Sequence, residues 1–309
     1  MSEDHPQITL SLAIIIAILA VSTASIFIRF AQREAPSLVI AALRLTVASL
    51  ILAPIALTRY RNELRKLTRS DVLLGLLSGI FLAIHFATWI SSLEYTSIAS
   101  SVVLVSTGPL WVALLSPIFL KEQLTKPVLT GMLLALLGGT IIGLSDSCQI
   151  NNGLICPPLS EFVQGTAFLG NFLALIGAWT VAGYLMIGRR LRTGMSLIPY
   201  IFVVYGIAAI VLLLIMFTAG QSPTGYSPMT YIWIILLALV PQLIGHSTYN
   251  WALRHMPAAL VSITTLGEPI GSAVLAYFIL REIPTLLTIL GGVLILAGIY
   301  LASRMKKTG

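Results

Sequence analysis

One acidic residue stands inside an apolar run in which a membrane helix is expected to be uniformly nonpolar. Glu268 lies between Gly267 and Pro269 within the run 257–280, and it is the only one of the eleven Asp and Glu residues in the middle of such a run. Polar groups deep in a bilayer are energetically costly, so each is a functional candidate. A carboxylate, a flexible residue and a helix breaker together indicate a role other than spanning.

Arg44 is a basic residue predicted to reach nearly the same depth. At helical rise, Glu268 lies about 16 Å and Arg44 about 19 Å from the inner face of a bilayer. Three interpretations of Glu268 remain open: an interaction with Arg44, direct or through a substrate; hydrogen bonding to backbone groups freed by Pro269; and a proton-coupling carboxylate.

Two polar and aromatic stripes supply the next candidates. Ser78, His85, Trp89 and Ser92 are spaced by 7, 4 and 3 residues, and Gln242, His246, Tyr249 and Asn250 by 4, 3 and 1. Such spacings place side chains mostly on one helical face. We expect both stripes to face an aqueous cavity suited to a small solute with charge and apolar surface, and five residues are expected to line it: His85, Trp89, His246, Tyr249 and Asn250. The alternative for each is an inter-helix hydrogen bond or an interfacial anchor.

Further cavity candidates are Trp111, Asn171 and Trp179, whereas Tyr184 is better explained by the aromatic belt near the cytoplasmic end. The chain lacks a Gly-x-x-x-x-Gly-Lys-Ser/Thr loop, His-Glu-x-x-His, Cys-x-x-Cys and a pair of intramembrane aspartates. We therefore expect no ATP-driven pump, no enzyme, no metal site and no cofactor.

The chain contains an internal duplication with an offset of 160 residues. Residues 93–138 align without a gap with 253–298, and the identical pairs include Pro109/Pro269, Glu122/Glu282, Gly131/Gly291 and Gly138/Gly298. Both prolines are predicted to form hinges, together with Gly267, because proline leaves helix carbonyls unpaired. The glycines are predicted to bring helices together, within one chain or between two.

The composition indicates a membrane protein. Of 309 residues, 57% are hydrophobic and 9% are charged, and the mean hydropathy is +0.97. The net charge of +7 does not indicate nucleic-acid binding, because the basic residues form short clusters between apolar runs. The sequence predicts an all-α fold in a lipid bilayer.

Ten runs are long enough to cross a bilayer of about 30 Å, and they cover approximately 8–28, 37–57, 72–93, 97–119, 127–145, 165–187, 196–218, 229–253, 257–280 and 285–303. Five spans per copy require the copies to have opposite orientations, as in inverted-repeat transporters. We therefore expect two inverted five-helix repeats, residues 1–145 and 165–309, around a central cavity.

Basic residues predict the orientation. With both termini cytoplasmic, fourteen Lys and Arg residues lie inside and only Arg29, Arg33 and Arg281 lie outside. The linker 146–164 then faces outward, where Cys148 and Cys156 form a disulfide or remain two unpaired thiols.

These residues resemble the EamA-domain permeases of the drug/metabolite transporter superfamily. The resemblance covers nearly the whole chain, and its most specific elements are the mid-span prolines, each followed by a basic residue and a glutamate: Pro109 with Lys121-Glu122, and Pro269 with Arg281-Glu282. Arg44 in the second span is also similar to the family. The resemblance implies a ten-helix basket, alternating access, and export of amino acids or related metabolites.

We therefore expect a secondary transporter of small organic metabolites in the inner membrane of a bacterium, with protons as a candidate coupling ion, acting as a monomer or homodimer. A nucleotide-sugar or nucleoside-type exchanger and a metabolite importer remain alternatives. From a different class, a membrane scaffold or assembly factor without solute flux is also considered. The mid-depth polar stripes favour transport over the scaffold.

Overall fold

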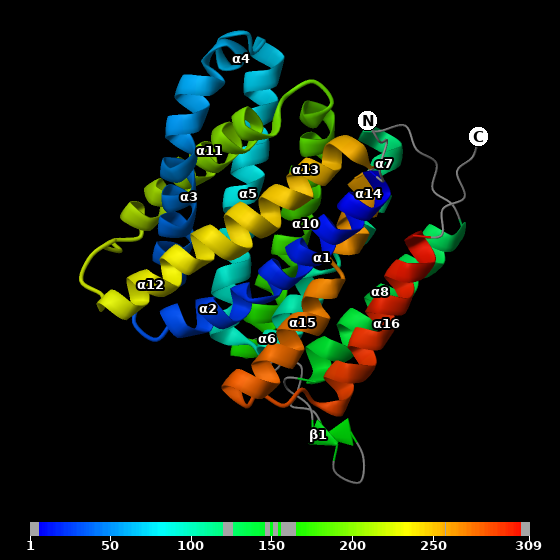
Figure 1. Cartoon of the computed structure of the whole chain (residues 1–309). Helices are drawn as coiled ribbons and strands as arrows, with labels where there is room; N and C mark the ends of the chain where they lie inside the picture. Colours follow the sequence, from blue (N-terminus) through cyan, green and yellow to red (C-terminus); the bar gives the residue numbers. More distant parts are fainter. Residues whose placement is uncertain are drawn as a thin grey trace.

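The computed structural model describes residues 6–119, 126–145, 149–150, 154–155, 165–256 and 258–303, which form a bundle of helices (Figure 1). The first half contains α1 (Pro6–Ser22), α2 (Ala24–Ala31), α3 (Ser37–Arg59), α4 (Arg61–Arg65), α5 (Arg69–Tyr95), α6 (Ile98–Val105), α7 (Gly108–Phe119) and α8 (Lys126–Ser145). α1 and α2 together form the first span, 10–31, and the short α4 connects α3 to α5.

The second half repeats this order. It contains α10 (Thr166–Arg192), α11 (Leu197–Thr218), α12 (Pro228–Leu237), η1 (Ala238–His246), α13 (Ser247–His255), α14 (Ala258–Thr264), α15 (Gly267–Leu275), η2 (Ala276–Leu280) and α16 (Leu286–Ser303). The π-helix η1 joins α12 and α13 into one span, and the π-helix η2 extends α15. Within the described ranges, this arrangement confirms the predicted all-α membrane fold.

Eight helical stretches among the described residues are long and apolar enough to cross a membrane, beginning with Leu10–Ala31 and ending with Val261–Leu280. The two other predicted spans correspond to α8 and α16, whose apolar stretches are shorter, Leu129–Ile142 and Leu286–Gly298. The last predicted span of each half is therefore an apolar helix at the expected position, but its apolar stretch is shorter than the ten-span prediction requires.

Several spans begin at a residue whose hydroxyl accepts a hydrogen bond from a free backbone N–H in the first turn of the helix. The Thr68 hydroxyl accepts a hydrogen bond from the Asp71 backbone N–H at 3.2 Å, and the Asp71 carboxylate accepts one from the Thr68 N–H at 3.0 Å. This reciprocal pair is a capping box. Ser97 and Ser227 cap α6 and α12 by accepting from the N–H groups three residues onward.

The spans that contain Pro109 and Pro269 are both broken, at positions that correspond to within one residue. The first break separates α6 from α7 at residues 106–107, and the second separates α14 from α15 at residues 265–266. Pro109 and Pro269 therefore lie in the first turn of the second helix half, where a missing N–H is tolerated. The Thr265 carbonyl, which faces Pro269 one turn later, accepts instead from the Glu268 N–H at 2.9 Å.

Helix pairing reproduces a two-fold relation between the halves. α3 packs against α11, α6 against α15, and α8 against α16, so three spans each contact their own counterpart. α5 packs along α10, and the η1–α13 span of the second half packs against α1 in the corresponding way. This exchange is what two inverted repeats produce when an axis in the membrane plane relates them.

Glycines allow the closest of these contacts, between α8 and α16, which run side by side (Figure 1). A Cβ atom placed on Gly138 would lie 2.5 Å from the Gly291 carbonyl oxygen, and one placed on Gly298 would collide with the carbonyl of Gly131. The predicted glycine stripes therefore pack against each other within one chain.

The two ends of the bundle are distinct. α4 lies at the upper end in Figure 1, and β1 lies at the lower end. β1 (Gln149–Ile150) pairs antiparallel with β2 (Leu154–Ile155), within the segment predicted to link the repeats. The predicted disulfide partners Cys148 and Cys156 lie outside the described residues, as do Lys121 and Glu122.

Candidate functional site

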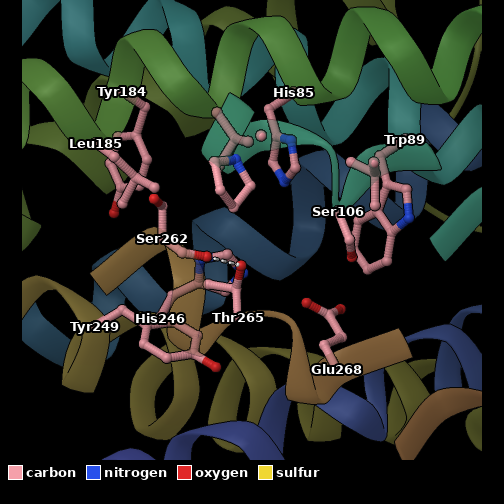
Figure 2. Close-up of a pocket in the computed structure, with 14 residues that line it drawn as sticks. His85, Trp89, Ser106, Tyr184, Leu185, His246, Tyr249, Ser262, Thr265 and Glu268 are labelled. Atoms are coloured by element: carbon pink, nitrogen blue, oxygen red, sulfur yellow. Dashed lines mark hydrogen bonds between the residues drawn. The ribbon is translucent and has the colours of Figure 1, made fainter. Parts of the chain in front are cut away.

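A cavity lies between the two halves at the level of both helix breaks (Figure 2). The first half contributes His85, Trp89, Val105, Ser106, Gly108 and Pro109, and the second contributes Val181, Tyr184, Leu185, His246, Tyr249, Ser262, Thr265 and Glu268. Each half supplies one polar and aromatic stripe and one broken span, so the cavity lies where the two repeats meet.

The cavity is narrow in this conformation. It offers about 50 Å³ to the centres of water-sized molecules, which is room for a few waters, since one water needs about 10–15 Å³ measured in this way. An organic metabolite is larger than this space, so its binding requires the lining residues to move apart.

Two histidines and two aromatic donors form much of the cavity wall. The Nδ1–H of His85 donates to the Gly177 carbonyl at 2.9 Å, because a carbonyl oxygen can only accept, so a neutral His85 presents Nε2 as an acceptor. The ring centroids of His85 and His246 are 6.4 Å apart. Trp89 Nε1 and the Tyr249 hydroxyl have no hydrogen-bond partner among the described residues. The wall thus combines one fixed acceptor with two unsatisfied donors.

Glu268 enters the cavity from the first turn of α15 and lies on the side opposite His85 (Figure 2). The equivalent residue on α7 is Gly108, which also lines the cavity. A carboxylate at a helix N-terminus is favoured by the helix dipole. The charged group of this cavity therefore comes from one repeat only.

Arg44 lies behind the cavity wall, fully buried in α3. Its Nε donates to Gln242 Oε1 at 3.0 Å, and its guanidinium carbon lies 4.2 Å from the centroid of the Phe86 ring. Phe86 in turn contacts the two cavity histidines, with ring centroids 4.8 Å from His85 and 5.3 Å from His246. One aromatic ring thus separates the arginine from residues that line the cavity.

Asn250 belongs to a buried hydrogen-bond network next to the cavity. Its Nδ2 donates to the hydroxyl of Tyr184 at 2.5 Å and to that of Tyr205 at 3.2 Å. Tyr184 is 1% exposed and lines the cavity, which corrects its assignment to the aromatic belt. Asn250 therefore reaches the cavity through Tyr184 and is not part of its lining.

The remaining sequence candidates lie away from the cavity lining. Trp111 donates from Nε1 to Thr107 Oγ1 at 3.2 Å, and its ring packs against Trp179 at 5.3 Å between centroids. Trp179 is 40% exposed on the outside of the bundle. Asn171 is buried and its Oδ1 accepts from Thr96 Oγ1 at 3.0 Å. Gly267 packs closely on Ile18 of α1, because an added Cβ would lie 2.6 Å from that side chain.

Sequence reasoning did not identify several hydroxyl residues of the cavity. Ser106 and Thr265 lie at the two helix breaks, Ser262 lies in α14, and all three line the cavity. For Ser106 and Thr265 the available signal was a position three or four residues before Pro109 and Pro269, since proline disturbs hydrogen bonding one turn before it.

Polar contacts also join the halves at the end of the bundle nearest β1. Glu282, which follows η2, accepts from the Ile98 N–H at the start of α6 at 2.6 Å. Arg29 Nη2 donates to the Thr96 carbonyl at 2.8 Å, and Thr96 contacts Asn171 of α10. The start of α6 and Thr96 just before it are thereby held by contacts from both halves of the chain.

A helical bundle of two inverted repeats with a cavity between them is the architecture of secondary transporters. The profile of the EamA-like transporter family matches the chain twice, over residues 8–144 and 168–304, and these ranges are offset by 160 residues (168 − 8 and 304 − 144). The chain belongs to the EamA-like transporter family.

Curated relatives agree with this membership. An uncharacterized transporter of Archaeoglobus fulgidus is 22% identical over 280 residues, covering 90% of this chain and 91% of the relative. The pseudopaline exporter CntI of Pseudomonas aeruginosa is 24% identical over 242 residues, covering 78% of each chain. A solved protein structure matches with a TM-score of 0.66 at 18% identity over 95% of this chain and 96% of that one, which supports the fold alone.

Proposed function

We propose that this transporter exports small organic metabolites, amino acids or amine-containing relatives, by alternating access across the cytoplasmic membrane of a bacterium, with both termini in the cytoplasm. The observation that carries the proposal is Glu268, whose carboxylate enters a cavity lined by both repeats. A lone carboxylate in a low-dielectric cavity favours a cationic group on the solute, and an amine supplies one.

The other cavity residues have complementary roles in this proposal. Trp89 and Tyr249 offer apolar surface and unsatisfied donors, and His85 and His246 add polar contacts. Glu268 and Arg44 recognise charge or gate the cavity, and the breaks at Pro109 and Pro269 act as the hinges about which the helix halves turn. The name of the Pseudomonas aeruginosa relative, an exporter, supports the outward direction.

Protons are the proposed coupling ion, because Glu268 can exchange a proton as well as bind an amine. In purified form in liposomes, the protein is expected to catalyse counterflow of a labelled amino acid, and the Glu268→Gln variant is expected to lose both rate and pH dependence. Glu34→Gln is the matched control, because Glu34 is an acid in the loop between α2 and α3, outside the cavity.

Two outcomes would contradict this proposal at separate points. Unchanged pH dependence in Glu268→Gln would exclude proton coupling through this residue. Failure of every solute in a broad panel to move, combined with co-purification of a stable partner, would favour a non-transporting scaffold.

A further inference from the structure

Arg44 has a fixed orientation but an incomplete set of partners. Nε is hydrogen-bonded to Gln242, and the guanidinium plane lies over Phe86, so two contacts hold the group in place. Nη1 and Nη2 are both buried without a hydrogen-bond partner among the described residues. The unused edge of this guanidinium is therefore a preformed pair of donors.

The charge of Arg44 also needs compensation. An arginine remains protonated in proteins, and a buried charge without a partner costs several kcal/mol. Glu268 is near enough for each group to experience the other's charge, but no ion pair joins them among the described residues. An anion that reaches Nη1 and Nη2 would satisfy both the charge and the two donors.

A carboxylate is the anion that this edge fits best. Two parallel N–H donors of a guanidinium match the two oxygens of a carboxylate, and such bidentate bonds are stronger than neutral hydrogen bonds. The two charges also differ in position, since Glu268 lines the cavity whereas Arg44 lies behind Phe86. A solute that carries both an amine and a carboxylate could contact both groups at once.

The partition between Arg44 and the cavity lies beside an irregular helix. It includes the Phe86 ring, which contacts Arg44, and the His246 ring, which meets Phe86 edge-on and lines the cavity. Gln242 and His246 both belong to η1, which also contains Pro241. π-helical turns are less regular than α-helix and are frequent at functional sites. A shift of η1 would move the partner of Arg44 and part of the partition together.

We propose that Arg44 is the carboxylate-binding residue of this transporter, and that the solute is a zwitterion whose amine binds at Glu268. The proposal rests on the proposed function and makes it narrower, because it assigns the substrate class of the same cavity. Arg44 then determines specificity, since it separates amino acids from amines that lack a carboxylate.

The test compares each acid with its own amide. Counterflow in liposomes is measured for L-leucine and L-phenylalanine and for L-leucinamide and L-phenylalaninamide, which keep the amine and lack the carboxylate. Loss of a charge-assisted pair costs on the order of tenfold or more in rate, so the wild-type protein is expected to prefer each acid by about that factor. Arg44→Met is expected to reduce the ratio of acid to amide toward one, with Arg44→Lys in between.

Arg192→Met is the matched control for removing a buried arginine. Arg192 is also buried, at 1% exposed, but its guanidinium is hydrogen-bonded within the fold. Its Nε donates to the Asn250 carbonyl at 3.0 Å, and its Nη1 donates to the Met195 carbonyl. This variant is expected to lower protein yield without changing the ratio of acid to amide.

The inference is overturned if wild-type protein transports acids and amides equally. It is also overturned if Arg44→Met reduces both solutes by the same factor. A third contrary result is that Arg44→Met abolishes transport of both solutes while Arg44→Lys keeps the wild-type ratio. These results would assign Arg44 to packing or to a gating pair with Glu268, and the proposed function would stand. If wild-type protein moves neither acids nor amides, the inference fails, and failure of the broader solute panel as well would count against the proposed function itself.

Discussion

The contact between α8 and α16 gives a prediction in which adjacent glycines are expected to differ. An alanine Cβ at position 138 would lie 2.5 Å from the Gly291 carbonyl oxygen, whereas one at position 139 would have as its nearest neighbour Leu104 Cδ2 at 3.6 Å. Gly138→Ala and Gly139→Ala therefore make the same chemical change on the same helix, but only the first enters the interface.

The magnitude follows from the separation that the extra methyl group requires. Ordinary van der Waals contact begins at 3.4 Å, so α8 and α16 must separate locally by about 0.9 Å (3.4 − 2.5). The obstructing atom is a backbone carbonyl and cannot turn away as a side chain can. Overpacking of this kind costs about 1–3 kcal/mol, and the intrinsic helix propensity gained on replacing glycine is shared by both variants. We expect Gly138→Ala to be less stable than Gly139→Ala by about 1–3 kcal/mol.

The measurement is denaturant-induced unfolding of the purified variants in mixed micelles, followed by tryptophan fluorescence. Gly291→Ala and Gly292→Ala repeat the comparison on α16, because their added Cβ atoms would lie 2.6 Å from the Gly138 carbonyl and 3.9 Å from Val103 Cγ2. Equal midpoints within both pairs would refute the close packing of these helices as the source of stability.

Two further predictions concern acidic residues outside the cavity. Hydrogen bonds from the Ser227 N–H and the Thr230 hydroxyl hold the pKa of Glu34 below its usual value, so this contribution to stability is present above about pH 4.3 and is lost as pH falls through the lowered pKa. Melting temperature measured from pH 6 downward should therefore fall more for wild-type protein than for Glu34→Gln, and parallel curves would contradict it. Glu282→Ala should destabilise the protein by about 1–3 kcal/mol because it leaves the Ile98 N–H without its acceptor, whereas Glu282→Gln keeps an acceptor and should cost less in the same melting assay.

The repeat architecture could be predicted because the residues that determine it are rare and keep their spacing. Pro109 and Pro269 each lie in the first turn after a helix break, and the glycines of both stripes meet at one interface. Such positions tolerate few alternatives, since only glycine permits the approach of the two backbones.

The cavity could be predicted only in part, because depth along a helix does not determine the direction in which a side chain points. His85 and Trp89 share one face of α5 and lie together at the cavity, as their spacing suggests. Arg44 has the appropriate depth but lies behind Phe86, and Asn250 lies behind Tyr184. The packing of neighbouring helices determines these directions, and a single sequence does not show how the helices pack.

The α8–α16 interface has the form of an isologous dimer contact enclosed in one chain. Gly138 of the first unit meets Gly291 of the second, and Gly131 of the first meets Gly298 of the second. Because 291 is the repeat counterpart of 131 and 298 that of 138, these are two copies of the same contact. In a homodimer of identical five-helix units, every residue would occur twice, once in each unit. Such an assembly could place two carboxylates in its cavity, at 108 and 268, or none. Joining two units into one polypeptide allows a single acid, so the fused chain can offer a solute a cavity with one negatively charged side.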